Sequence, residues 1–523
     1  MKSINEPKTY KYTEYPSDCL VDWFNHIHYY TYKPLKWQIP LFEILDYAIQ
    51  GKCSRIMISA PPQHGKTELL VNTFISYYMV NNPNDKVIVT AYSESRATKY
   101  GSRIRDIIKE FGQDTLTKPQ LKQDYQRKTN FLFEHPYDGE LLAAGAHGAI
   151  MGNPANLILI DDPIKEIKDA RSPTLQEDLE DWYDTSIDTR LRKRYRVHKK
   201  ALPPIIVVVA QRLDERDLQG ILLEKEPNID GKEAMNILRS GGSIEPNTWV
   251  NMNFPALSEG SDIDILGRPK DTPLWSKHKN YEDLLADRRR RGTQRFNMIM
   301  QGHPSNENDY QFKHEWFYNS PDYDDNSLTC LVDYKDVPKL LPTGRFWDLA
   351  GHKKLKKGQR PPKTDYYAGS LVSKDYTNDN LYIYHLERSK RDVTAVNRVI
   401  RTLLVNDGID VFTVIEQEPG SMPLLFIDTL QQEFPQNQII PIKPTEDKLY
   451  RSYELKRLAE NRCLKFVVHE NSDKQWVHTA IEELESFDGE DSNASKGKHD
   501  DIPDSFGSAA NYFKLNRRLY VPY

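Results

Sequence analysis

The chain has 523 residues, a formal net charge of -5 and four cysteines. This length exceeds what one hydrophobic core supports, so we expect two or three domains. The cysteines are scattered, without a CxxC spacing or a Cys/His cluster, which favours a reducing compartment and argues against a structural zinc site. A polar N-terminus and the lack of an apolar run near ~20 residues predict a protein that is not secreted and has no membrane span.

An aromatic-rich segment opens the chain, and in it Trp37 and Gln38 precede an amphipathic helix predicted over residues 40–49. The amide of Gln38 can reach an adenine edge, with Trp37 as a neighbouring apolar surface. The alternative is a buried Trp37 and a Gln38 that only caps the helix.

Residues 59–67 have the pattern of a phosphate-binding loop (P-loop), between a predicted strand at 55–59 and a predicted helix at 68–78. Backbone N–H groups at such a helix start converge on phosphates. Lys66 would contact the β and γ phosphates of ATP and Thr67 its Mg²⁺. Ala60 replaces the first glycine of the pattern. The predicted nucleotide-binding residues of this stretch are Gln38, Gln63, His64, Gly65, Lys66, Thr67 and Glu68.

Further apolar strands are predicted at 86–92, 156–161 and 203–210, with a helix at 96–111 and a flexible turn across the glycines of 139–152. Asp161 and Asp162 follow the second of these strands. In a P-loop enzyme this is the Walker B strand, where Asp161 would hold Mg²⁺ through water and Asp162 would polarise the attacking water. The alternative is an Asp-Asp-Pro turn after a core strand.

The second half of the chain has its own strand pattern. Three antiparallel strands, a helix and a parallel strand are predicted between residues 345 and 416, with Asp348 and Glu416 at strand ends, and this order resembles a ribonuclease H-like core. The predicted fold class is therefore α/β. It joins an N-terminal P-loop NTPase with a mostly parallel, doubly wound sheet of the additional-strand type to a C-terminal ribonuclease H-like domain. The predicted domains are an ATPase core at 1–225, a lid or linker subdomain at 226–300 with a helix near 281–300, an interdomain linker at 301–325 and a nuclease domain at 326–523.

Carboxylates at two strand ends and one helix start can converge on a pair of Mg²⁺ or Mn²⁺ ions, which would activate water for phosphodiester cleavage. Asp501 and Asp504 share one face of the predicted last helix. The alternative is that each acid merely stabilises a helix or strand end. The predicted metal ligands of this site are Asp348, Asp365, Glu416, Asp500, Asp501 and Asp504, of which Asp348, Glu416, Asp501 and Asp504 are the predicted catalytic residues.

Three basic runs, at 190–200, 287–292 and 352–360, predict a polyanionic partner despite the negative net charge.

In the order of these motifs the chain resembles the large terminase subunit of tailed bacteriophages, from about Tyr32 to Tyr512. The motifs that carry the resemblance are residues 36–38, the P-loop, 160–165, 182–183, 189–191, 211–218, 347–350, 364–366, 415–420 and 499–504. The resemblance implies that ATP hydrolysis drives duplex DNA into a procapsid and that a metal-dependent endonuclease cuts concatemeric DNA.

The resemblance also implies partners: double-stranded DNA, a portal protein, a small terminase subunit and further copies in a ring, in the host cytoplasm and transiently on the procapsid. It makes Gln211 part of a motif that senses the γ-phosphate, where relatives usually have a small hydroxyl residue. Relatives often carry an arginine inside the P-loop, which this chain lacks. Arg190 and Arg212 are therefore candidates for the charge-stabilising arginine, in cis or from a neighbouring subunit.

Two alternatives belong to other classes. An ATP-dependent helicase with a nuclease appendage would need a second motor domain, and no stretch after residue 220 offers its motifs. A non-enzymatic capsid or scaffold component would lack the catalytic carboxylates, and both acidic sets are present.

The basic run 352–360 lies between Asp348 and Asp365, so we expect it to lead the DNA backbone to the metals. Neutralising its lysines should weaken plasmid cleavage and leave ATP hydrolysis intact. An unchanged cleavage rate would contradict this role.

Overall fold

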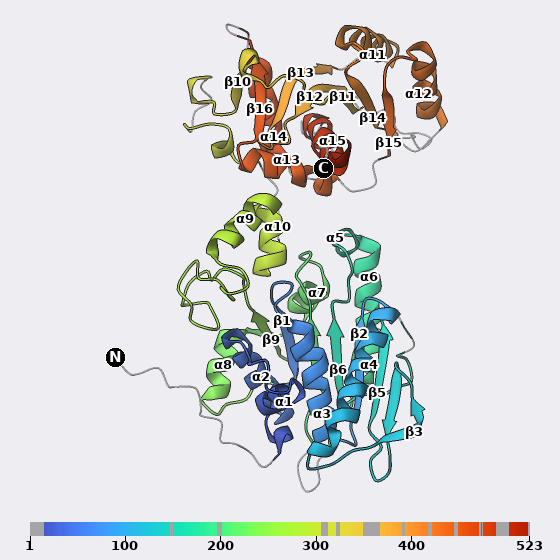
Figure 1. The fold of residues 1–523 in the computed structure, drawn as a ribbon, viewed down its shortest axis with the longest axis vertical. Helices are drawn as coiled ribbons and strands as arrows, with labels where there is room; N and C mark the ends of the chain where they lie inside the picture. The colour runs from blue at the N-terminus through green and yellow to red at the C-terminus, as the bar shows by residue number, and fades with distance from the viewer. Residues whose placement is uncertain are drawn as a thin grey trace. The chain divides into compact units, whose positions relative to one another are not determined.

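The computed structural model describes residues 15–146, 148, 150–195, 201–304, 312–320, 325–348, 367–389, 393–416, 421–443, 448–469, 472, 474–487 and 501–520. The chain forms two compact units, Met1–Ala286 with Arg295–Pro304, and Asp287–Gln294 with Ser305–Tyr523. Each unit has its own sheet (Figure 1). Among the described residues, no helix has the length and apolar character needed to cross a membrane.

The first unit is built on a nine-stranded sheet in the order β3-β4-β5-β2-β6-β7-β1-β9-β8 (Figure 1). From β5 to β8 all neighbours are parallel, and β3 and β4 are antiparallel additions at one edge. The bounds are β1 (Arg55–Ser59), β2 (Lys86–Ala91), β3 (Leu121–Gln126), β4 (Asn130–Phe133), β5 (Glu140–Gly145), β6 (Leu157–Asp161), β7 (Ile205–Val209), β8 (Asn228–Asp230) and β9 (Trp249–Asn253).

Helices cover both faces of this sheet, because every residue of β6 and β7 is buried and both sides need apolar partners. One face packs on α1 (Leu20–Ile27), α2 (Ile39–Ile49), α3 (Phe74–Asn81), α4 (Glu94–Phe111) and α8 (Gly231–Arg239). The other packs on α6 (Pro173–Trp182) and α7 (Leu218–Lys225). The short α5 (Ile167–Ala170) follows the Walker B strand.

The apolar runs at 55–59, 86–92, 156–161 and 203–210 form β1, β2, β6 and β7, so these predictions are confirmed. The flexible turn at 139–152 is wrong in its first half, because Glu140–Gly145 is β5. The segment 226–300 also supplies β8 and β9 to the sheet. The sequence Trp-Val-Asn-Met-Asn of β9 contains two polar residues, so it did not stand out as a buried strand.

The single helix predicted near 281–300 is interrupted. It comprises α9 (Tyr281–Arg291), α10 (Thr293–Phe296) and a π-helical segment, Asn297–Gln301. Gly292 between the first two has φ +79°, a left-handed conformation that favours glycine and ends the helix.

The second unit has a seven-stranded sheet in the order β10-β16-β13-β12-β11-β14-β15. β13, β12 and β11 are antiparallel, and β14 and β15 continue in parallel from β11, which confirms the predicted ribonuclease H-like order. The bounds are β10 (Leu331–Asp333), β11 (Thr343–Asp348), β12 (Tyr367–Lys374), β13 (Leu381–Ser389), β14 (Phe412–Glu416), β15 (Ile439–Ile442) and β16 (Leu464–Val468).

Side chains alternate between the two faces of this sheet, and each face forms a separate hydrophobic core. Phe346 and Val414 face one side, with α13 (Lys448–Glu460), α14 (Gln475–Ser486) and α15 (Asp501–Leu515). Trp347 and Ile415 face the other side, with α11 (Val393–Asp407) and α12 (Ser421–Glu433). The last helix is the short α16 (Arg517–Tyr520).

One arginine of the basic run 190–200 is part of the core. Arg194 is completely buried, and its guanidinium donates to the carbonyl oxygens of Ala48 (2.7 Å), Ile49 (3.0 Å) and Pro203 (2.7 Å). Ala48 and Ile49 are the last residues of α2, whose end carbonyls need donors. Arg194 is therefore a structural residue and not a polyanion contact. Residues 196–200 and the run 352–360 lie outside the described residues.

Replacing Arg194 by Met should lower the free energy of unfolding of the first unit by about 3 kcal/mol, because three buried carbonyls lose their donor. Arg192→Met is the matched control, since the side chain of Arg192 is exposed, and it should change stability by less than about 0.5 kcal/mol. Urea unfolding of both variants checks this. Equal stability of the two variants would contradict the capping role.

Candidate nucleotide and metal sites

The predicted nucleotide-binding residues meet at the carboxyl ends of three adjacent parallel strands. Register aligns Val209 of β7 with both Ile58 of β1 and Asp161 of β6. The P-loop follows β1, Asp161 ends β6 and Gln211 follows β7, so all three reach the same edge of the sheet. In open α/β sheets this edge is where ligands bind.

The P-loop has two residues in left-handed conformations, Gln63 (φ +61°) and Gly65 (φ +81°). A Cβ at Gly65 would lie 3.4 Å from Nε2 of Gln38, so Gln38 packs directly against the loop. Its Oε1 accepts a hydrogen bond from the Leu35 backbone at 2.9 Å. Trp37 is a core residue, with 1% of its surface exposed. Gln38 thus lies beside the loop and its side chain also caps the helical turn Lys36–Gln38, so both parts of the alternative, a buried Trp37 and a capping Gln38, are observed.

The ring of His64 packs against three other aromatic rings. Its ring centroid is 6.2 Å from that of Trp37, 5.9 Å from Trp275 and 5.3 Å from His278. Nδ1 lies 2.8 Å from the Pro62 carbonyl oxygen, and donates to it in the neutral ring. Burial lowers the pKa of His64 to about 4, so the ring is neutral at physiological pH.

Lys66 points into the loop, where its Nζ donates to the carbonyl oxygens of Ala60 and Pro61. Burial lowers the pKa of Lys66, while Asp162 and Asp161 oppose that shift. A π-helical segment, Glu68–Thr73, follows Thr67. The carboxylate of Glu68 lies 3.1 Å from Nε2 of His28 and accepts from Nδ2 of Asn72 at 2.8 Å. The side chain of Glu68 is therefore paired with His28 and Asn72.

Asp161 is buried, and α4 supplies its partners. Its Oδ2 accepts a hydrogen bond from Tyr100 and lies 3.4 Å from Nη2 of Arg96, while its Oδ1 has no hydrogen-bond partner. Burial, with the neighbouring charge of Asp162, raises the pKa of Asp161 to about 6.

Asp162 has φ +45°, which is unusual outside glycine and is often found at functional sites. Its Oδ1 accepts from the backbone N–H of Gln211 at 3.2 Å, and its Oδ2 lies 3.4 Å from Nη2 of Arg96. Gln211 thus reaches the acids through its backbone. Arg96 and Tyr100 were missed from the sequence, although their spacing of four on a helix capped by Ser93 was a usable signal.

Neither arginine proposed from the sequence contacts these acids. The Nε of Arg212 pairs with both carboxylate oxygens of Asp217, at 3.0 and 3.1 Å. The carbonyl of Arg190 accepts from the N–H of Ala155, just before β6 begins, which is the opposite edge of the sheet. Arg190 therefore cannot serve its own P-loop.

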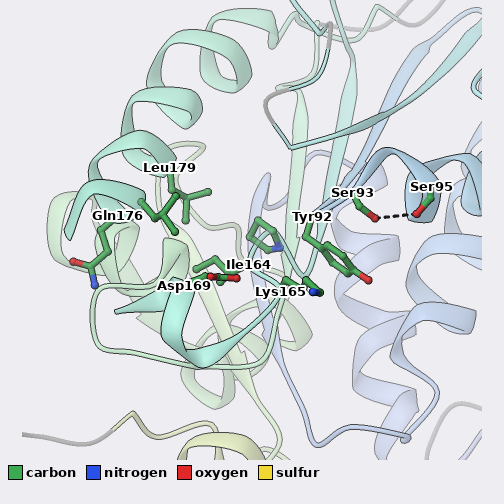
Figure 2. Close-up of a pocket in the computed structure, with 10 residues that line it drawn as sticks. Tyr92, Ser93, Ser95, Ile164, Lys165, Asp169, Gln176 and Leu179 are labelled. Carbon is green, nitrogen blue, oxygen red and sulfur yellow. Dashed lines mark hydrogen bonds between the residues drawn. The ribbon is translucent and has the colours of Figure 1, made fainter. Parts of the chain in front are cut away.

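A cavity of about 540 Å³ lies next to the Walker B strand (Figure 2). Figure 2 shows Gln176 and Leu179 of α6 on one side, and Tyr92, Ser93 and Ser95 on the other. Ile164 and Lys165, which follow β6, also line the cavity. The guanidinium of Arg96 lies 5.4 Å from the ring centroid of Tyr92, so the cavity adjoins the nucleotide site.

In the second unit, the register of the strands brings three predicted or charged residues to one side of the sheet. Asp348 lies opposite Ala368, and Ala368 opposite Arg388, on antiparallel strands. Trp347 pairs with Ile415, so Asp348 and Glu416 end neighbouring parallel strands. Directly opposed residues point to the same face. Asp348, Glu416 and Arg388 therefore share the face that α15 covers.

The first turn of α15 is fixed on this face by Ser505, whose Oγ donates to the carbonyl of Phe346 at 3.1 Å. Asp501 and Asp504 are both buried. Nη2 of Arg388 lies 2.5 Å from Oε2 of Glu483 and 3.7 Å from Oδ2 of Asp501. Arg388 and Glu483 were missed from the sequence, because they come from β13 and α14 and form no local motif.

The predicted ligands Asp365 and Asp500 lie outside the described residues. Among the residues the structure does describe, no group of three or more His, Cys, Asp or Glu side chains is close enough to hold a metal ion. The structure thus aligns Asp348 with Glu416, and places Asp501 beside Arg388 and Glu483.

Two family models match the sequence. "Terminase large subunit, T4likevirus-type, N-terminal" matches residues 57–193, and "Terminase RNaseH-like domain" matches residues 346–513. No curated protein matches the chain.

Solved structures of large terminases are similar to this chain at low identity. The large terminase of the thermophilic bacteriophage D6E is 10% identical, with a TM-score of 0.42, and the match covers 92% of this chain and 99% of that one. The large terminase of bacteriophage HK97 is 11% identical, with a TM-score of 0.34 and coverage of 86% and 90%. The zinc-bound nuclease of the large terminase of thermophilic phage G20c is 16% identical, with a TM-score of 0.23 and coverage of 33% and 81%. The D6E protein has also been solved with ADP and with ATP-gamma-S.

The fold, together with the residues at the carboxyl ends of β1, β6 and β7 (the P-loop edge), defines a P-loop ATPase joined to a ribonuclease H-like domain. The family models fall on both of these units, and the chain belongs to the terminase large subunit family. It is therefore an enzyme of DNA packaging, an ATPase with a nuclease domain, as the resemblance predicted.

The neutral His64 predicts a pH dependence. Its folded pKa of about 4 is below the unfolded value near 6.5, so its stabilising contribution is complete above pH about 6.5 and is lost as the pH falls toward 4. Between these pH values the wild type should lose about 3 kcal/mol more unfolding free energy than His64→Asn, which has no titrating group. Urea unfolding across pH tests this, and parallel curves for the two proteins would contradict it.

Proposed function

We propose that the P-loop edge hydrolyses ATP to translocate duplex DNA into a procapsid, and that the second unit is a two-metal endonuclease that cuts concatemeric DNA. The observation that carries the motor assignment is the meeting of Lys66, Asp161 and Asp162 at one sheet edge. We also propose the division into an ATPase core at 1–225, a lid or linker subdomain at 226–300 whose β8 and β9 extend the core sheet, a linker at 301–325 and a nuclease domain at 326–523.

The residues at this edge fit a magnesium nucleotide. Asp161 offers a buried oxygen, Oδ1, with no protein partner, and Gly65 has the left-handed backbone that lets N–H groups converge on phosphates. Thr67 and Asp161 would hold Mg²⁺, and Lys66 the β and γ phosphates. Mg²⁺ supplies neutralisation of the phosphate charge. Asp162 would orient the attacking water, and its backbone link to Gln211 connects β6 to β7.

For the nuclease we propose that Asp348, Glu416, Asp501 and Asp504, with Asp365 and Asp500, hold two Mg²⁺ or Mn²⁺ ions. All-oxygen donors suit these hard cations. The shared face of Asp348 and Glu416 under the start of α15 supports this set. The ions would supply activation of the attacking water and stabilisation of the leaving oxygen.

The partners we propose are double-stranded DNA, a portal protein, a small terminase subunit and other copies of the chain in a ring, in the host cytoplasm and transiently on the procapsid. Sequence-independent binding of DNA requires contacts to its phosphates. The exposed Arg288, Arg289 and Arg290 of α9 are candidates for these contacts. The alternative, an ATP-dependent helicase-nuclease, would unwind a duplex with an overhang, which a packaging motor would not.

The first test measures ATP hydrolysis and plasmid cleavage with Mg²⁺ or Mn²⁺ for two variants. Lys66→Ala should reduce ATP hydrolysis at least ~100-fold, because the phosphate charge loses its buried cation, and should leave cleavage unchanged. Asp348→Ala should abolish cleavage and leave ATP hydrolysis unchanged.

Lys99→Ala and Asp336→Ala are the controls, because each removes an exposed charge of the same sign from the same unit. Loss of both activities in either test variant would contradict two separate sites. A wild type that cleaves no DNA with either metal would refute the nuclease assignment.

A further inference from the structure

Arg96 contacts both acids of the Walker B strand. β2 and β6 are neighbours, with Ala91 beside Asp161, and α4 begins directly after β2. Arg96 lies in the first turn of α4, so its Nη2 is 3.4 Å from a carboxylate oxygen of Asp161 and equally far from one of Asp162. The site therefore contains a cation that comes from this chain itself.

The guanidinium of Arg96 contacts two tyrosine rings. It lies 5.4 Å from the ring centroid of Tyr92 and 5.7 Å from that of Tyr100, and its Nε donates to the Tyr100 hydroxyl. The same hydroxyl donates to Asp161. Stacking on aromatic faces suits the planar guanidinium better than an ammonium group.

The ionic contacts of Arg96 are weak for their kind. Charge-assisted hydrogen bonds measure about 2.7–2.9 Å, and both contacts of Arg96 measure 3.4 Å, with 32% of the side chain exposed. Arg194, in contrast, donates at 2.7 to 3.0 Å to three carbonyl oxygens, and the Nε of Arg212 donates at 3.0 and 3.1 Å to Asp217. Arg96 can therefore exchange partners at low cost, whereas the other two cannot.

Lys66, the acids and Arg96 form one group of interacting charges. Lys66 interacts electrostatically with Asp162, Asp161 and Arg96, so the guanidinium lies near the point where Lys66 would hold the γ-phosphate. A cation bound at Oδ1 of Asp161 would reduce the negative charge of that carboxylate and weaken the 3.4 Å contact of Arg96 to its Oδ2. Binding of magnesium nucleotide would thus free the guanidinium beside the phosphate.

We propose that Arg96 is the catalytic arginine of ATP hydrolysis, supplied in cis, and that it exchanges the acids for the γ-phosphoryl group. This rests on the proposed ATPase function of the site. Water attacks the γ-phosphorus and passes a proton to Asp162, the bond to the bridging oxygen breaks, and ADP and inorganic phosphate leave. Arg96 neutralises the negative charge that develops in this step. Tyr100 retains its bond to Asp161.

The test compares wild type, Arg96→Ala and Arg96→Lys with the control Lys109→Ala, which removes an exposed cation from the same helix. Arg96→Ala should reduce kcat about 1,000-fold, near the low end for arginine fingers. The affinity for magnesium ADP with aluminium fluoride, measured by calorimetry, should fall at least ~100-fold, and that for magnesium ADP should change less than ~3-fold. Arg96→Lys should be intermediate, and Lys109→Ala should match wild type.

Melting curves separate this role from a structural one, and Arg96→Lys keeps the test valid if the alanine variant does not fold. Equal binding of the aluminium fluoride complex by wild type and Arg96→Lys would overturn the assignment of Arg96 alone. A wild type that binds no nucleotide would overturn the proposed function as well. Mixing Arg96→Ala with Lys66→Ala should restore no ATP hydrolysis, because the arginine acts in cis. Recovery would overturn the proposal in favour of an arginine supplied by a neighbour.

Discussion

Parallel strand register is the constraint on which the first unit depends. β1, β6 and β7 end in line, so three segments separated by up to ~150 residues deliver their next residues to one edge of the sheet. The interiors of these strands are apolar, since helices cover both faces, and their polar residues lie at the strand ends. The chemistry of the site is therefore concentrated where the buried strands stop.

That concentration has an electrostatic cost which the neighbouring helix offsets. A buried carboxylate next to a second one is unfavourable, as the raised pKa of Asp161 indicates. Tyr100 donates to it, and Arg96 and Lys66 supply positive charge. In the second unit Arg388 lies in the same relation to Glu483 and Asp501. Each acidic site thus includes an arginine from another element.

Much of the site could be predicted from the sequence, because its parts are local motifs. Lys66, Asp161, Asp348 and Glu416 follow apolar runs, and such runs mark strand ends. The partners of these residues could not be predicted in the same way. Arg96, for example, reaches Asp161 and Asp162 because β2 pairs with β6.

The sequence by itself determined the class of fold, the order of the main strands and the position of each acid along its strand, since hydrophobic periodicity and turn residues act locally. Tertiary structure decided which residues face one another. It placed β9 beside β1, buried Arg194 against the end of α2, and set Arg388 opposite the start of α15. The reason is that these contacts depend on strand register and helix packing between distant segments, where a shift of one residue reverses every side chain.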